Sequence, residues 1–134
     1  MKKNVLANRI ITPDGTMLQS FTRNHFVKHN DQNGKEYAVD GGLDYQRVFV
    51  HDDAPHTDAR VYDTDPHDVI RTAFCWGSYG KDGKQPLTWM PLCTMSDAHI
   101  EAILHTQTHI PPHIYGVFEN EQTYRELLNI NVGD

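Results

Sequence analysis

The chain has 134 residues, enough for one domain with its own hydrophobic core and without metal or disulfide cross-links. Its formal net charge of −6, with histidine counted as neutral, opposes a broad phosphate-binding surface but leaves room for one local basic site. No stretch approaches the roughly 18 apolar residues of a membrane-spanning helix, and the basic first residues are not followed by a signal-peptide core. We therefore expect a cytoplasmic protein with no membrane contact, whose two cysteines are reduced.

The first third of the sequence predicts two β-hairpins. Residues 9–21 contain a Pro-Asp-Gly turn, in which proline presets φ and glycine accepts positive φ. Residues 25–39 contain a polar tip that ends in Asn-Gly, a strong hairpin signal. A further strand is expected at 45–50, and an edge strand at 59–62. Two short hairpins are the layout of a zinc ribbon, but no cysteine stands at either tip, so we expect no structural zinc.

The segment 39–47 connects this half to the rest and has the most unusual composition in the chain. It holds two carboxylates, a glycine pair, a tyrosine and an arginine within nine residues. Adjacent glycines predict a sharp turn or a close approach of the backbone to another group. An arginine binds phosphate through a two-pronged contact, and a tyrosine can stack on a base. The candidate ligand-binding residues of this segment are Asp40, Gly41, Gly42, Asp44, Tyr45 and Arg47.

About three helices are predicted in the second half. Asp65 is the expected N-cap of the first, Gly77 its expected stop, and His67 is expected to be exposed. Ser96 is the expected N-cap of the second helix, and the third follows the prolines at 111–112. The apolar stripe of the first helix is formed by Val69, Ile70, Ala73 and Phe74.

A glycine-rich stretch, residues 76–89, lies between the first two helices. Glycines let backbone N–H groups approach a phosphate, and flanking aromatic rings can stack on a base. The candidate ligand-binding residues here are Trp76, Tyr79, Lys81, Lys84 and Trp89. The spacing is not that of a P-loop. The alternative is a wide connecting loop that its tryptophans attach to the core, and the general behaviour of loops favours this alternative.

Two histidine-bearing stretches suggest metal binding, but neither completes a known ligand pattern. Residues 51–58 alternate histidine and aspartate, and three further histidines follow at about helical spacing, at 105, 109 and 113. The second group lacks the carboxylate of a His-Glu-x-x-His site. A solvated surface explains both stretches, so we expect neither a metal nor a cofactor.

Four motifs give the chain a resemblance to a family of small uncharacterised proteins of tailed bacteriophages and prophages. They are a Val-Asp-Gly-Gly-x-Asp-Tyr-Leu-Arg-type signature at 39–47, with Gln46 at the Leu position, Asp-Pro-x-x-Val-Ile-Arg at 65–71, the glycine-rich loop at 76–87 and Met-Ser-x-x-His-Ile-x-Ala-Ile-Leu at 95–104. The resemblance covers most of residues 9–125. It implies a phage accessory protein that acts on host metabolism or defence in the cytoplasm of the infected bacterium, and it supplies no activity.

The predicted fold is α+β in one domain, with a hairpin-rich half at 9–50 and a helical half at 65–130. The predicted function is non-enzymatic binding, with no assembled catalytic set. The partner is either a small nucleotide signal, sequestered to counter host defence, or a host protein. A pocket shared within a homo-oligomer would compensate for the small subunit. The alternative is a metal-assisted phosphodiester or nucleotide hydrolase, whose groups would be Asp40, Asp44, His25 and the segment 51–58.

Overall fold

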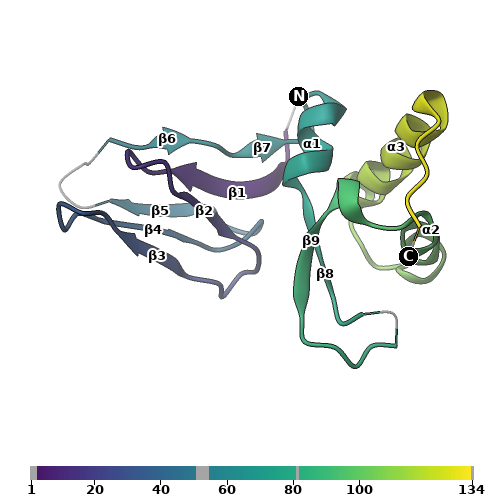
Figure 1. Ribbon diagram of the computed structural model, residues 1–134, viewed down its shortest axis with the longest axis horizontal. Coiled ribbons are helices and arrows are strands. Elements are labelled where there is room, and N and C mark those ends of the chain that lie inside the picture. Colours follow the sequence, from purple (N-terminus) through teal and green to yellow (C-terminus); the bar gives the residue numbers. More distant parts are fainter. Residues whose placement is uncertain (1–2, 51–54, 81, 134) are drawn as a thin grey trace. The chain divides into compact units, whose positions relative to one another are not determined.

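The computed structural model describes residues 3–50, 55–80 and 82–133, and it has an α+β fold (Figure 1). The chain forms two compact units. The sheet unit is Val5–Tyr62, and the helical unit holds the described residues from Asp63 onward together with those before Val5. The predicted halves 9–50 and 65–130 fall in different units. Within the described residues, no helix is long and apolar enough to cross a membrane.

The described residues of the sheet unit form seven strands. They are β1 (Val5–Ile11), β2 (Met17–Ser20), β3 (Val27–Asn30), β4 (Glu36–Asp40), β5 (Arg47–Val50), β6 (Thr57–Asp58) and β7 (Val61–Tyr62). The antiparallel pairs β1–β2 and β3–β4 are the two predicted hairpins, and β5 adds to β4 as the expected next strand. β6 and β7 both pair with β1. Of the edge strand expected at 59–62, residues 61–62 form a strand, and a second short strand precedes it at 57–58.

The core of the sheet unit lies between its two sheets. Ile10 and Leu18 from β1 and β2 pack with Tyr37 and Val39 of β4, and all four are buried. Alternate residues of β3 and β5 add Val27, Val48 and Val50 to this core, as the two-residue period of a strand requires.

Carboxylates close both hairpin tips, where a zinc ribbon would carry cysteines. Asp31 accepts hydrogen bonds from the backbone N–H groups of Asn33 and Lys35, both at 2.9 Å. Asp14 accepts hydrogen bonds from Thr12 and from His29. These two hydrogen bonds, that from Thr12 first, hold the pKa of Asp14 well below its usual range. The tips are thus stabilised by hydrogen bonds and ion pairs in the described structure.

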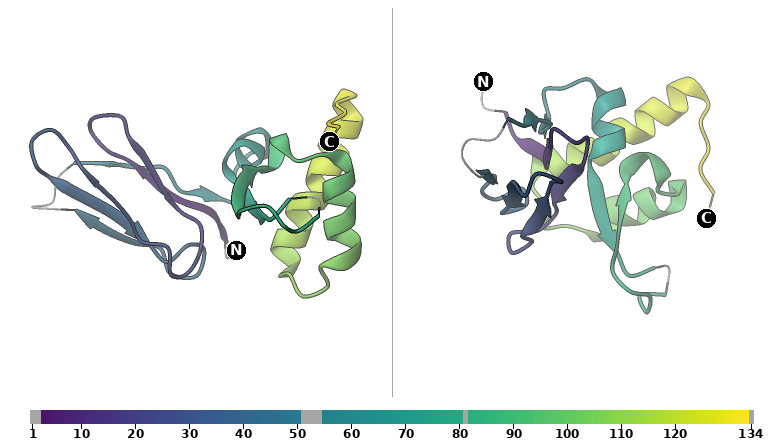
Figure 2. Two further views of the ribbon diagram at one scale, coloured as in Figure 1. Left: turned by 60° about the horizontal axis from the view of Figure 1, so that its bottom comes forward. Right: turned by 60° about the vertical axis from the view of Figure 1, so that its left-hand side comes forward.

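In the helical unit, the described residues form three α-helices and one hairpin. Its elements are α1 (His67–Ala73), β8 (Cys75–Ser78), β9 (Thr88–Pro91), the short 3-10 helix η2 (Leu92–Thr94), α2 (Asp97–Thr106) and α3 (Pro112–Leu128). The three predicted helices are confirmed, and Ser96 caps α2 as expected by accepting a hydrogen bond from His99 N at 3.0 Å. The two views of Figure 2 show α2 and α3 side by side.

Three details of the first helix differ from the prediction. Pro66 rather than Asp65 is in the N-cap position. The helix ends at Ala73, and Gly77, the expected stop, lies inside β8. Val69 is exposed, so the buried stripe is shorter than its apolar pattern suggested. The helix ends early because the chain continues as strand β8 from Cys75, so the last predicted helical turn does not form.

An aromatic cluster forms part of the core of the helical unit. The ring of Phe118 on α3 makes edge-on contacts with two other rings. Its centroid lies 5.8 Å from that of Phe74, which follows α1, and 5.2 Å from that of Trp76 in β8.

At the start of this unit, Asn4 and Asp63 are joined by hydrogen bonds. Asp63 N donates to Asn4 O at 2.9 Å, and Asn4 donates in return, through its backbone N–H and its side-chain amide, to the Asp63 carboxylate.

Candidate functional site

The turn between β4 and β5 needs both of its glycines for structural reasons. Gly41 and Gly42 have φ of 95° and 55°, in the left-handed region that glycine favours. A β-carbon on Gly42 would lie 2.5 Å from the backbone of Thr22, and one on Gly41 would lie 2.0 Å from Tyr45 O. Both glycines are buried, and Gly42 N already donates to Ser20 Oγ at 2.9 Å. These two candidates therefore shape the turn, and their surroundings leave no room for a ligand against their backbone.

The same turn places Arg47 in a charged and aromatic environment. Its Nη2 donates to Asp40 Oδ2 at 2.6 Å. Its guanidinium lies over the ring of Tyr45, 4.8 Å from the centroid, and 5.6 Å from the centroid of Phe49. A cation over an aromatic face is stabilised by the quadrupole of the ring. Three of the predicted residues, Asp40, Tyr45 and Arg47, are thus brought together.

Two further side chains extend this cluster at its ends. The guanidinium of Arg23 lies 5.8 Å from the centroid of Tyr45, whose hydroxyl donates to Arg23 O at 2.9 Å. At the other end, the rings of Phe26 and Phe49 are 6.0 Å apart. We call this row of five side chains the cation–aromatic ladder. In order of contact it consists of Arg23, Tyr45, Arg47, Phe49 and Phe26.

The ladder lies on the side of the β3–β4–β5 sheet that faces away from the core. β5 alternates, with Val48 and Val50 toward the core and Arg47 and Phe49 on the outer face. Ala38, opposite Phe49 on β4, is only 1% exposed, which fits a small residue covered by its neighbours. Phe49 and the other phenylalanine of the ladder are nevertheless 45% and 52% exposed. The outer face therefore presents aromatic surface to solvent.

Among the described residues, the charges on this face leave one arginine without a carboxylate partner. Asp40 pairs with Arg47, and Glu36 pairs with Lys28 at 3.1 Å. In the part of the chain that the structure describes, Arg23 makes no ion pair. Arg47 uses one N–H for Asp40 and is 57% exposed, so its other in-plane donors face solvent. The ladder is locally cationic although the chain carries a net charge of −6.

The remaining predicted residues do not form a comparable cluster. Asp44 is exposed at the signature turn. Trp76 and Trp89 belong to the β8–β9 hairpin of the helical unit, where Trp76 packs on the core and Trp89 lies against Gly77. Lys81 lies outside the described residues. The last two, Tyr79 and Lys84, are exposed near the tip of that hairpin.

Residues 76–89 have the composition of a loop, so the sequence does not predict that their two ends pair as a hairpin. Its tip closes through hydrogen bonds from Gln85 N to Tyr79 O, at 2.8 Å, and from Gly83 N to Gly80 O, at 3.1 Å. Gly80 and Gly83 have positive φ, which these turns require. Among the described residues of the tip, the backbone N–H groups of Gly80, Gly83, Lys84 and Gln85 all donate within the turn, so the hairpin explains the two glycines with positive φ.

A buried ionic cluster connects the helices of the helical unit. Glu121 on α3 is fully buried and accepts hydrogen bonds from Arg71 (3.0 and 2.9 Å), His67 (2.9 Å) and Arg125 (2.7 Å). Burial by itself raises the pKa of Glu121, but these hydrogen bonds outweigh it and hold the pKa below its ordinary value. His67, which was expected to be exposed, is instead mostly buried. The cluster explains how a carboxylate lies in this core.

No group of three or more histidine, cysteine or carboxylate residues that could hold a metal ion occurs among the described residues. Of the histidines weighed as ligands, His105 bonds to Glu101 at 2.6 Å. The first half of the segment 51–58 lies outside the described residues. Comparison with known proteins adds no assignment: the sequence matches no family model, and no curated protein or solved structure is significantly similar to it. The resemblance to phage proteins therefore stays a prediction.

Three members of the ladder, Arg23, Phe26 and Phe49, were missed by sequence reasoning. One signal was present, because Tyr45, Arg47 and Phe49 alternate along the predicted strand and must share a face if that strand continues. The other two residues come from the connection before β3, whose distance from β5 is set by the sheet and has no signature in the sequence.

Proposed function

We propose that this protein is a non-enzymatic nucleotide-binding protein and that the cation–aromatic ladder is its binding surface. The observation that carries the proposal is the exposed row of rings and guanidinium groups on the outer face of β3–β4–β5. A nucleobase can stack on aromatic rings or on guanidinium planes whatever hydrogen-bonding groups it carries, because every base has a flat π-face. A phosphate accepts hydrogen bonds from guanidinium edges.

In this proposal the two ends of the ladder have different roles. The base stacks on Phe26 and Phe49, whose rings are half exposed. The phosphate lies next to the edge of Arg47 and is also attracted by Arg23, the arginine without a carboxylate partner in the described structure. Asp40 positions Arg47 through their 2.6 Å contact and also limits the local charge. The surface thus suits a ligand that combines one planar ring system with a small number of phosphates.

We further propose that binding, without chemical conversion, is the biological role, and that a phage accessory protein of this kind withholds a small nucleotide signal from the defence of its bacterial host. This part of the proposal rests on the resemblance of the four sequence motifs. A host protein that docks on the same aromatic surface is the competing partner, because tyrosine, phenylalanine and arginine are also enriched in protein interfaces.

The test is a calorimetric titration of the purified protein with mono-, di- and cyclic nucleotides. Phe49→Ala should weaken binding at least fivefold, since stacking is worth about 1–3 kcal/mol per base. Arg23→Ala should weaken it about tenfold and reduce its dependence on salt. Lys28→Ala is the matched control, because Lys28 carries the same charge on the same sheet face but pairs with Glu36 outside the ladder. Equal losses in Lys28→Ala and Arg23→Ala would refute a specific site.

The fate of the ligand separates sequestration from the two alternatives. Mass spectrometry should recover each bound nucleotide intact. Cleavage of the nucleotide would move the hydrolase to first place. If no nucleotide binds and a host protein is retained in a manner that depends on Phe49, the ladder is a protein interface.

A further inference from the structure

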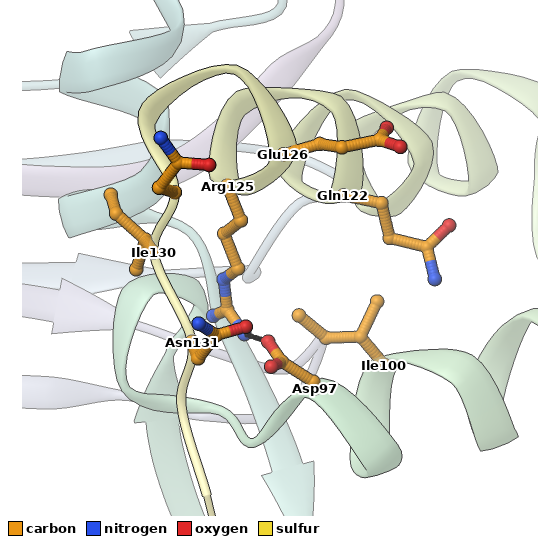
Figure 3. A pocket seen from close by; sticks show the side chains of 8 residues that line it. Asp97, Ile100, Gln122, Arg125, Glu126, Ile130 and Asn131 are labelled. Carbon is orange, nitrogen blue, oxygen red and sulfur yellow. Dashed lines mark hydrogen bonds and ion pairs between the residues drawn. The ribbon is translucent and has the colours of Figure 1, made fainter.

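The helical unit contains an open pocket that is unrelated to the ladder. It has a volume of about 470 Å³ and lies between α2, α3 and the chain that follows α3 (Figure 3). This volume is within the range of small-molecule sites. Ile100 of α2 and Ile130 after α3 supply its apolar surface, and Figure 3 shows them on opposite sides of the pocket.

The chain that follows α3 forms one wall of the pocket, and hydrogen bonds to α2 hold this wall in place. Asp97 N donates to Val132 O at 2.8 Å, and Val132 N donates to Asp97 Oδ2 at 3.2 Å. Asn129, the residue that ends α3, adopts the left-handed conformation and turns the chain back toward α2. The segment after α3 therefore closes one side of the pocket and is held there by its hydrogen bonds to Asp97.

Carboxylates and carboxamides make up most of the polar part of the lining. Asp97 and Glu126 contribute carboxylates, and Gln122, Asn129 and Asn131 contribute carboxamides. Glu126 is exposed and forms no ion pair with any described residue. The C-terminal end of α3 adds the partial negative charge of its last carbonyl groups.

Arg125, the cation among the described residues of the lining, is directed into the protein. Arg125 is 4% exposed, and its guanidinium donates to Glu121 and Asp97, both at 2.7 Å, and to Leu92 O at 3.1 Å. Its charge is balanced by these two carboxylates, so it offers little to a ligand. The described lining consequently presents Glu126, several amide oxygens and an aliphatic surface, while its arginine is engaged in ion pairs.

We propose that this pocket binds an aliphatic ammonium ion, of the class formed by polyamines and other alkylamines. The ammonium group donates to Glu126 and to the carboxamide oxygens, because it has three donors and no acceptor. The methylene chain lies along Ile100 and Ile130, which removes apolar surface from water.

The test is an NMR titration of the whole protein with spermidine and with 1,5-diaminopentane, using 1,5-pentanediol as the uncharged analogue. The amines should shift the side-chain NH₂ signals of Gln122, Asn129 and Asn131 in a saturable manner, and the diol should not. Glu126→Gln should weaken binding about three- to fivefold, as expected for a solvent-accessible charge pair. Because Glu126 has no partner in the described structure, the spectrum of this variant should stay that of the folded protein.

Glu119→Gln is the matched control. Glu119 is exposed two turns earlier on α3 and does not line the pocket, so its removal changes the net charge equally and should leave the affinity unchanged. Three outcomes would overturn the proposal: shifts spread over the acidic surface, equal effects of both variants, or equal shifts with Mg²⁺ and with the amines. Failure here leaves the nucleotide proposal untouched, because the pocket and the ladder belong to different units.

Discussion

Replacing Glu121 by glutamine should strongly destabilise the helical unit. The substitution keeps the shape of the side chain but removes the only carboxylate that contacts both Arg71 and Arg125 among the described residues. Arg125 is 4% exposed, so its charge would be left buried with Asp97 as its remaining ionic partner. Removing one member of a buried ion cluster costs about 3–5 kcal/mol, and we expect about 3 kcal/mol because glutamine keeps one acceptor oxygen.

Intrinsic fluorescence in urea measures this unit selectively. The chain has two tryptophans, Trp76 and Trp89, and both lie in the helical unit. With a denaturant slope of about 1 kcal/mol/M for a unit of this size, a loss of 3 kcal/mol lowers the midpoint by about 3 M urea. Glu119→Gln, an exposed change on the same helix, should shift the midpoint by less than about 0.5 M. Similar midpoints for the two variants would refute the reasoning.

The same variant tests the pH dependence of stability. The folded-state pKa of Glu121 is below its ordinary value of 4.5, so its contribution is fully present above pH 4.5. That contribution is lost as the pH falls through the lower pKa of the folded state. Glu121→Gln should therefore remove part of the acid-induced loss of stability below pH 4.5 that the unmodified protein shows. An unchanged acid profile would mean that Glu121 titrates alike in the folded and unfolded states.

Two further substitutions test the sheet unit. Gly42→Ala should cost more than about 3 kcal/mol, because its β-carbon would lie 2.5 Å from the backbone of Thr22; Gly34→Ala, with φ of 77° and no atom within 4 Å, should cost only about 1 kcal/mol. Circular dichroism in urea measures both, and equal losses would contradict the steric argument. Arg60→Ala should return the pKa of Asp58 from about 2 toward 3.8, because Arg60 holds that carboxylate through side-chain hydrogen bonds. Carbon NMR of the carboxyl group measures this change, and an unaltered pKa would show that another group is responsible.

The parts of the fold that sequence predicted are those decided by neighbouring residues. Turn residues located the first two hairpins, and Ser96 located the start of α2, because turns and caps depend on a few adjacent positions. The strand β8 was missed, because its four residues contain Gly77 and gain stability only by pairing with β9.

The candidate sites also depend on contacts between residues that are distant in the sequence. Glu121 and Arg125 are four residues apart on a helix, a spacing that normally indicates a solvated ion pair. Their burial follows from α1 and η2 packing over α3, which no local pattern encodes. The ladder could be predicted only in part, since the alternation from Tyr45 to Phe49 is local but the contact of Phe49 with Phe26 crosses the sheet.

The hydrogen-bonded pair Asn4 and Asp63 bears on how such a protein could be assembled from parts. The chain leaves the helical unit after Asn4 and returns to it at Asp63, and these two residues bond to each other through three hydrogen bonds of 2.8–2.9 Å. Since the two junctions are adjacent, a segment can be exchanged there without stretching the rest of the chain. The closure entropy of a loop grows only slowly with its length, so inserts of quite different size should be tolerated at this point. The junction formed by Asn4 and Asp63 is therefore the position at which the helical unit should best tolerate replacement of the segment between these two residues.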